Sequence, residues 1–125
     1  MKKLKQQPIE DLEKLLTYKF KTKKLLKQAL RHRSFVKNQT TTKSLLEHNE
    51  RLEFLGDAVL KLAISHYLFS NFAPFSEGQM SKIRAHVVSD ETLALAAQRI
   101  NLGAFIFLST NAINNGGRLQ ESILA

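Results

Sequence analysis

Three carboxylates share one face of a predicted helix in the middle of the chain. Glu50, Glu53 and Asp57 fall within about 60° of one another at ~100° per residue. Carboxylates in such a row repel, and helices usually interrupt the row with lysine or arginine. Mg²⁺ is bound by oxygen ligands and keeps several waters, so it would relieve the repulsion. The spacing therefore indicates either a divalent-metal site or a solvated acidic face.

Two other residues of this helix are unusual for their positions. Glycine costs about 1 kcal/mol relative to alanine inside a helix, so Gly56 is either incidental or permits close approach of another helix or of the carboxylates. Phe54 projects near the acidic face rather than the opposite apolar face. We expect it to anchor in a pocket of a second copy across a two-fold interface. Packing against another helix of the same chain is the alternative.

Composition and charge restrict the classes of function. The 125 residues are 43% apolar and 24% charged, which excludes a wholly disordered or collagen-like chain. The absence of cysteine excludes disulfides, zinc–thiolate sites and cysteine nucleophiles. No apolar run approaches the ~20 residues of a membrane span, and polar residues after the first lysines argue against a secretory signal. The net charge of +8 indicates either a polyanionic partner, nucleic acid before membrane, or a role in solubility alone.

Residues typical of helix starts and helix ends recur along the sequence around the acidic row, and we predict one all-α domain. Pro74 must end the long central helix, and Ser76 with Gln79 forms a capping box for the next helix. Ser89 or Asp90 caps the following helix, which Gly103 stops. Loops are predicted over 34–43 and 109–117, and a strand or buried loop over 104–108. Helices are predicted over about 9–16, 23–32, 44–72, 79–88 and 90–100, with another helix opening at 122–125.

The segment from His48 to Asp57, His-Asn-Glu-Arg-Leu-Glu-Phe-Leu-Gly-Asp, closely resembles the signature of the ribonuclease III family. The resemblance continues in the same order on both sides of the signature, over residues 26–34, 77–88, 93–103 and 116–125. It covers essentially the whole chain. We therefore expect residues 1–125 to form a ribonuclease III-type catalytic domain.

The resemblance implies a Mg²⁺-dependent endoribonuclease, with Mn²⁺ as a possible substitute. The family hydrolyses double-stranded RNA to 5′-phosphate and 3′-hydroxyl ends, and works as a homodimer whose two sites face one duplex. Glu53 and Asp57 match its metal ligands and catalytic residues, with Asp57 also orienting the attacking water. Glu50 and Glu77 match supporting acidic positions near the RNA. We expect no membrane and no small-molecule cofactor, and a role in rRNA or mRNA precursor processing in a bacterial cytoplasm or an organelle.

The sequence departs from the family pattern at its end. In the family an Asp follows the Ser-Ile-Leu-Ala stretch directly, and a Glu follows three residues later, whereas this sequence ends at Ala125. We therefore expect a partial domain with an incomplete C-terminal helix, two missing metal-binding acids and no double-stranded-RNA-binding domain. The alternative function is a non-catalytic ribonuclease III-like module that binds structured RNA or the ribosome.

Basic residues elsewhere have two interpretations each. Lys2, Lys3, Lys5 and the lysines of 19–27 either contact RNA phosphates or form a solvated face. We expect Arg84 to make a structural pair, and Arg118 to contact RNA or a carboxylate. The four histidines show no metal-ligand spacing and are predicted to be core or surface residues.

Overall fold

The structure is a computed structural model that describes residues 5–36 and 42–125. Within these ranges it holds helices and an isolated parallel bridge between Arg31 and Phe107, and no strand, which confirms the all-α prediction. Lys2, Lys3 and part of the predicted 34–43 loop lie outside the described residues. The elements are α1 (Ile9–Leu16), α2 (Lys23–Ala29), η1 (Arg33–Phe35), α3 (Thr42–Leu45), α4 (Glu50–Asn71), α5 (Glu77–Val87), α6 (Asp90–Arg99), η2 (Leu102–Ala104), α7 (Thr110–Asn114), η3 (Gly117–Leu119) and α8 (Glu121–Leu124).

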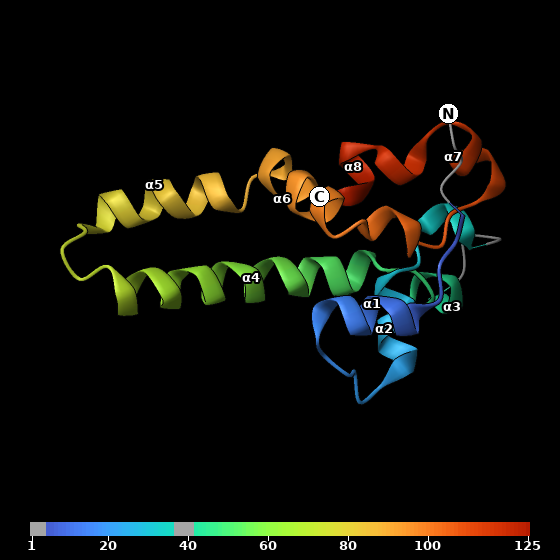
Figure 1. Ribbon diagram of the computed structural model, residues 1–125, viewed down its shortest axis with the longest axis horizontal. Coiled ribbons are helices and arrows are strands. Elements are labelled where there is room, and N and C mark those ends of the chain that lie inside the picture. Colours follow the sequence, from blue (N-terminus) through green and yellow to red (C-terminus); the bar gives the residue numbers. More distant parts are fainter. Residues whose placement is uncertain (1–4, 37–41) are drawn as a thin grey trace.

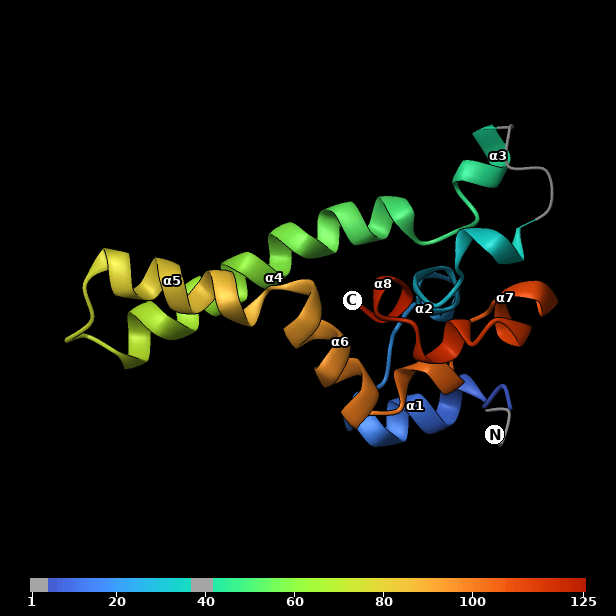
Figure 2. The same ribbon diagram turned by 90° about the horizontal axis from the view of Figure 1, so that it is seen from above.

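The elements form a body and a projecting arm. Figure 1 shows α4 running out of the body and α5 returning beside it, while the short helices gather around the beginning of α4. The view from above in Figure 2 shows α6 leading back from the arm to the body, where α8 ends. The arm is sparsely packed, because Leu68 is the one buried residue among the described positions of α4 and α5.

Two apolar clusters hold the body together, and the segment 104–108 contributes to both. Ala104 and Phe105 pack with α1 and α2, whereas Ile106 and Leu108 pack with α6 and α8. The segment is a buried loop rather than a strand: Phe107 donates its N–H to the Leu30 carbonyl at 2.8 Å and accepts from the His32 N–H at 3.1 Å. The segment 104–108 therefore links the end of α2 to the apolar cluster formed with α6 and α8.

Most predicted helices are present, and capping explains their boundaries. Ser76 and Gln79 form the predicted capping box of α5, and Ser89 caps α6 by accepting the Thr92 N–H. The predicted 109–117 loop was wrong in part, because α7 forms there with Ser109 accepting the Ala112 N–H. The first turn of that helix shows no apolar periodicity, which is why the sequence pattern favoured a loop.

The long helix is shorter than predicted at its beginning. It starts at Glu50 rather than near residue 44, and α3 is a separate turn before it. The reason is tertiary: His48 is buried, and the Asn49 N–H donates to the Arg31 carbonyl at 2.9 Å rather than to a carbonyl one turn earlier, so the helical hydrogen bonding is interrupted here. Likewise α2 ends at Ala29, before the bridge formed by Arg31.

Arg118 corrects one sequence-based interpretation. Its side chain is buried and donates to the carbonyls of Gly103 at 2.6 Å and Ile106 at 2.9 Å, and to Oε1 of Gln6 at 2.9 Å. It therefore neither faces RNA nor pairs with a carboxylate. Arg84 does have a structural contact, since its Nη1 donates to the Ser65 hydroxyl at 2.7 Å and joins α5 to α4.

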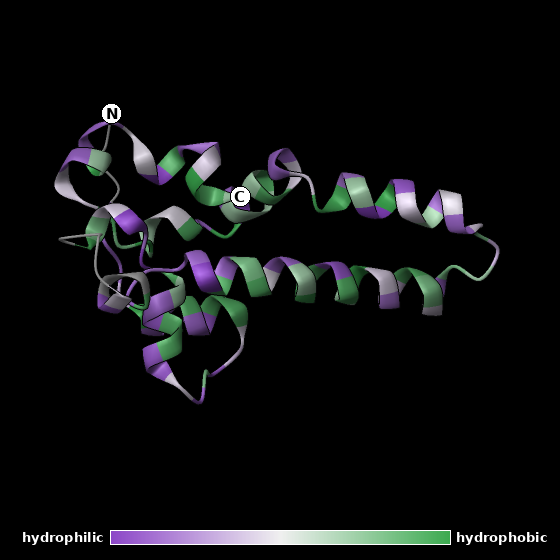
Figure 3. Cartoon of the chain, turned by 180° about the vertical axis from the view of Figure 1, so that it is seen from behind, coloured by the Kyte–Doolittle hydropathy of each residue, from purple (hydrophilic) through white to green (hydrophobic). Residues whose placement is uncertain are grey.

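None of the helices in the described part of the chain is both long and apolar enough to cross a membrane. Figure 3 shows apolar positions distributed along the whole of α4, alternating with polar ones. Several are strongly exposed on the arm, among them Leu55, Leu62 and Phe69 at 59%, 70% and 76%. Exposed apolar residues along one helix are typical of a surface that another chain or segment covers.

Candidate active site

The first turn of α4 is set by a buried histidine. Asn49 occupies the cap position without a side-chain cap bond, and Nδ1 of His48 accepts the Glu50 N–H at 3.4 Å instead. His48 is 3% exposed, so the ring ties the start of α4 into the body. Glu50 and Glu53 follow in the first turn, where the helix dipole favours negative charge. The body therefore fixes the end of α4 that carries the acidic row.

Glu50 lies at the edge of the site and already has a cationic neighbour. Nη1 of Arg33 lies 3.4 Å from its Oε1, and Nδ1 of His48 lies 3.9 Å from its Oε2. Because that His48 nitrogen accepts the backbone N–H, the 3.9 Å contact is not an ion pair. Arg33 therefore balances the charge of Glu50 in part, with both side chains about half exposed.

Glu53 and Asp57 lie one helical turn apart on the same face, as the spacing predicts. Both line a groove of about 760 Å³, here called the acidic groove, which α4, α6 and α8 enclose. Nζ of Lys61 lies 2.7 Å from Oδ2 of Asp57, one turn further along α4. This pair is half exposed on both sides and so is worth only a few tenths of a kcal/mol. Asp57 can therefore exchange Lys61 for another cation at little cost.

The opposite wall of the acidic groove comes from distant parts of the chain. It includes Val88 just after α5, Asp90 and Leu93 in the first turn of α6, and Ser122 and Ala125 of the final segment. The closeness of Ala125 to Glu53 and Asp57 follows from the burial of Leu124 against α6. Residues joined to Ala125 would begin at this groove.

Phe54 and Gly56 stand on α4 beside the acidic row. Phe54 is 85% exposed, so the alternative of packing against another helix of the same described chain does not hold. For Gly56 the structure favours the alternative of an incidental glycine, because a Cβ added there would meet nothing within 4 Å. No close approach within the described part of this chain accounts for the glycine.

Glu77 lies away from the other acids. It begins α5, accepts a hydrogen bond from the Ser81 hydroxyl at 2.6 Å, and lines a different groove of about 460 Å³ with Phe69 and Met80 on the arm. The structure therefore brings Glu50, Glu53 and Asp57 together and leaves Glu77 apart. Its supporting role stays a prediction.

Three residues near the acids escaped the sequence reasoning: His32, Arg33 and Lys61. His32 and Arg33 line a cavity of about 450 Å³ with Glu50 and Glu53. Burial lowers the pKa of His32, Arg33 lowers it further, and the two glutamates oppose the shift. The i, i+4 spacing of Lys61 from Asp57 was a usable signal. Nothing in the sequence alone placed residues 32 and 33 beside residues 50 and 53.

The donor set fits a hard divalent cation in part. Mg²⁺ is usually held by one or two carboxylates together with waters. Four acidic residues line the acidic groove, Glu50, Glu53, Asp57 and Asp90, and of these Glu53 and Asp57 lie one turn apart on the same face of α4. The described residues contain no group of three or more acidic, histidine or cysteine side chains placed to hold a metal. Any such ion would therefore rest on these two carboxylates and on water or substrate oxygens.

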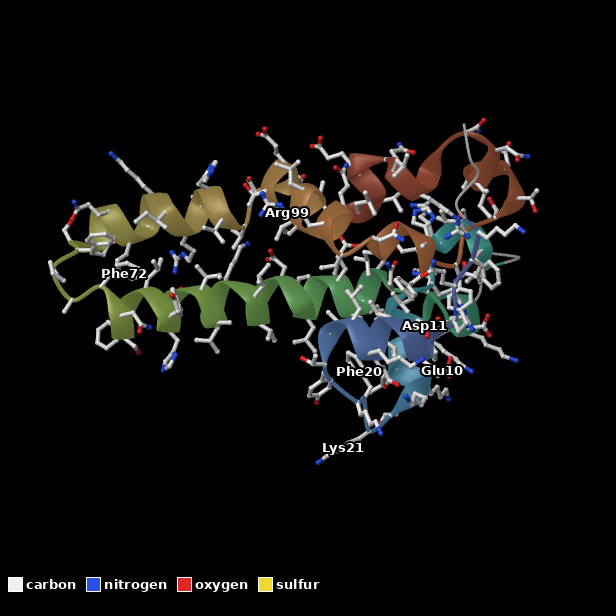
Figure 4. The ribbon with its side chains drawn as sticks, viewed as in Figure 1. Glu10, Asp11, Phe20, Lys21, Phe72 and Arg99 are labelled. Carbon is white, nitrogen blue, oxygen red and sulfur yellow. The ribbon has the colours of Figure 1, made fainter. Side chains whose placement is uncertain are left out.

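None of residues 17–22, the loop between α1 and α2 that carries Lys19 and Lys21, lines the acidic groove. Figure 4 shows Phe20 and Lys21 on this loop and Arg99 on α6. Lys23, which follows the loop as the first residue of α2, pairs with the buried carboxylate of Glu13. The loop therefore does not border the acidic groove.

Comparison with known proteins agrees with this arrangement. Residues 22–125 match the family described as Ribonuclease-III-like. Ribonuclease 3 of Campylobacter jejuni strain RM1221 is 51% identical over 117 residues, which are 94% of this chain and 49% of that protein. Ribonuclease 3 of Nitratiruptor sp. is 47% identical over the same share of this chain and 48% of its own length. The chain thus spans about half the length of the curated relatives it matches.

Solved structures give the same result. A structure of the nuclease domain of Campylobacter jejuni ribonuclease III, described as showing structural flexibility in the region involved in dimer formation, superposes with a TM-score of 0.82. It is 50% identical, and the match covers 94% of this chain and 76% of that one. A second structure of that domain has a TM-score of 0.81 at 48% identity, covering 94% of this chain and 75% of that one. The chain belongs to the ribonuclease III family and has the fold of its nuclease domain.

Proposed function

We propose that residues 1–125 belong to one domain, the nuclease domain of a double-stranded-RNA endoribonuclease. The observation that carries this is the pairing of Glu53 and Asp57 in one groove of a ribonuclease III-type fold. The net charge of +8 supports a nucleic-acid partner. A double helix of RNA would be recognised by its A-form shape, its phosphates and its 2′-hydroxyls, with little reading of bases. The relatives are bacterial, which favours the cytoplasm over an organelle as the compartment. We propose precursor RNA processing as the role.

Glu53 and Asp57 would hold Mg²⁺, or Mn²⁺ in its place. A metal bound there supplies stabilisation of the phosphate charge and a water of lowered pKa. Asp57 would also accept a hydrogen bond from the attacking water and orient it toward the phosphorus. Lys61, now 2.7 Å from Asp57, is flexible enough to turn toward a phosphate oxygen once a metal occupies the carboxylate. Glu50, paired with Arg33, and Glu77, on the second groove, would support RNA placement.

The working form would be a homodimer with Phe54 at its interface. A side chain that is 85% exposed and aromatic suits an anchor that fills a pocket in a second copy. The exposed apolar positions of α4 extend the surface that a second copy would cover. The related nuclease domain from Campylobacter jejuni has a region involved in dimer formation, which supports the same arrangement here.

The activity is tested with one RNA sequence in two forms, single-stranded and as a long duplex, each with Mg²⁺ and with EDTA. We expect cleavage of the duplex alone, only with Mg²⁺, to fragments with 5′-phosphate and 3′-hydroxyl ends. These ends distinguish attack by water from attack by the neighbouring 2′-hydroxyl, which leaves cyclic phosphates. EDTA-resistant cleavage, or cyclic phosphate ends, would contradict the proposal.

The same experiment separates the alternative function. Salt-sensitive binding of the duplex without cleavage would identify a non-catalytic RNA-binding module, because phosphate contacts weaken with salt whether or not the strand is cut. Absence of both binding and cleavage would contradict both functions.

A further inference from the structure

His32 is held so firmly by its neighbours that its tautomer follows from the hydrogen bonds. Its Nδ1 accepts the Ser34 N–H at 3.2 Å and lies 2.9 Å from the Ser34 hydroxyl. That hydroxyl oxygen accepts the Ser109 N–H at 3.2 Å, so its own proton is available to Nδ1. Both contacts use Nδ1 as an acceptor, and the proton of the neutral ring therefore resides on Nε2.

The position of the ring is fixed as well. The His32 N–H donates to the Phe107 carbonyl at 3.1 Å, and the residue caps η1. Burial lowers the pKa of His32, which favours the neutral ring that this tautomer requires. A rigid neutral donor of this kind needs no rearrangement to meet a ligand.

His32 lines a cavity that carboxylates also line. Since Ser34 occupies the Nδ1 edge, the edge that carries Nε2 is the one left for the 450 Å³ cavity, which Glu50, Glu53 and Ser122 also line. The cavity shares Glu50, Glu53, Ser122 and Ala125 with the acidic groove. A strand lying in the groove would therefore have this donor within the adjoining space.

The charges of the cavity select the kind of group that suits it. Two glutamates face a neutral histidine there, and Arg33 lies 3.4 Å from the carboxylate of Glu50. A phosphate would meet the remaining negative charge of Glu53. A hydroxyl carries no charge, accepts from the Nε2–H, and donates to a carboxylate, so it satisfies both partners at once. In a ribose–phosphate strand the hydroxyl is the 2′-hydroxyl, the group that distinguishes RNA from DNA.

We propose that His32 is a specificity residue that donates its Nε2–H to a 2′-hydroxyl of the RNA strand, with a carboxylate of the same cavity accepting the hydroxyl proton. This inference rests on the proposed function, because it needs an RNA duplex in the acidic groove. It assigns to His32 a contact with substrate rather than a purely structural role.

Two substitutions of His32 distinguish a contact with the RNA from a role in the fold alone. His32→Asn keeps an acceptor for the Ser34 N–H, as asparagine is a good cap, and removes the donor on the cavity side. His32→Gln places an amide N–H₂ near the position of Nε2 and gives up the cap. If His32 acts only through the fold, His32→Asn should bind the RNA duplex more tightly than His32→Gln. If His32 contacts the 2′-hydroxyl, His32→Gln should bind the RNA duplex more tightly than His32→Asn.

The measurement is the dissociation constant for two duplexes of one sequence in EDTA, one of RNA and one with 2′-fluoro nucleotides. Fluorine keeps the A-form sugar pucker but neither donates a hydrogen bond nor accepts one well, so shape is matched and the hydroxyl is lost. For the RNA duplex we expect His32→Asn to weaken binding about three- to ten-fold, the effect of one neutral hydrogen bond. Binding of the 2′-fluoro duplex should not change with this substitution, and His32→Gln should recover part of the RNA affinity.

Each other outcome overturns the proposal. Equal weakening of both duplexes by His32→Asn would mean that the histidine acts through the fold, and no weakening of either would mean that it touches no substrate. In both cases binding of the RNA duplex by the unaltered protein leaves the proposed function standing. Failure of the unaltered protein to bind the RNA duplex would remove the proposed function and this inference together.

Discussion

Replacing Arg118 by methionine tests how the wall of the acidic groove is held in place. The guanidinium donates to the buried carbonyls of Gly103 and Ile106, and α8 begins three residues later. Methionine keeps an apolar stem but leaves two acceptors without this donor, at about 1–3 kcal/mol each. Burial disfavours the cation and lowers the pKa of Arg118, so its removal offsets part of the loss. We expect a net loss of about 2–3 kcal/mol in the free energy of unfolding.

Urea unfolding measures this loss. With a slope of about 1–3 kcal/mol per molar, the midpoint should fall by about 0.7–3 M while the slope stays unchanged. The urea midpoint of Arg118→Lys should lie between those of the unaltered protein and Arg118→Met, because lysine keeps the charge but lacks the planar guanidinium that reaches two carbonyls. The control is Arg99→Met at an exposed position in the last turn of α6, with an expected change within about 0.5 kcal/mol. A loss below about 1 kcal/mol for Arg118→Met would refute the reasoning.

Three further predictions concern self-association, helix stability and pH. Phe54→Ala should lower self-association in sedimentation at micromolar concentration while Phe69→Ala, equally aromatic and 76% exposed, should lower it less; equal effects would contradict an anchor at Phe54. Gly56→Ala should raise the stability of the monomer by about 1 kcal/mol, since its Cβ meets nothing within 4 Å, and thermal unfolding that shows a loss would contradict this. The hydrogen bond from Lys23 holds the pKa of Glu13 below its ordinary value of 4.5, so this carboxylate contributes stability above about pH 4.5 that disappears as the pH falls through the lower, folded-state pKa. Unfolding measured across that range should show a shallower pH dependence for Glu13→Gln, and an unchanged dependence would oppose this assignment.

Local signals in the sequence were sufficient where neighbouring residues decide the structure. The capping box at Ser76 and the serine cap at Ser89 are satisfied within three residues, so α5 and α6 begin within two residues of the predicted positions. The face shared by Glu53 and Asp57 follows from helical spacing alone. The start of α4 could not be predicted in this way, because the burial of His48 and the bond from Asn49 to Arg31 are tertiary.

The candidate site likewise combines contacts that neighbouring residues decide with contacts that only the tertiary structure creates. The i, i+4 pairing of Lys61 with Asp57 is local, whereas the approach of Arg33 to Glu50 spans 17 positions along the chain. Arg118 was misassigned because a basic residue between two motifs gives no sign that it is buried among carbonyls. The resemblance to the ribonuclease III family placed the acids on the right helix but could not place Glu77 on a separate groove.

The most direct test of the acidic groove as the active site is cleavage of an RNA duplex by Asp57→Asn beside Glu91→Gln. Both substitutions remove one carboxylate charge, but Asp57 lines the groove whereas Glu91 is exposed in the first turn of α6 and is not among the residues that line the groove. We predict that Mg²⁺-dependent cleavage falls at least about a hundred-fold for Asp57→Asn, within the range that loss of one charge-stabilising group produces, and is retained for Glu91→Gln. Retained cleavage by Asp57→Asn would contradict the assignment of the chemistry to this groove.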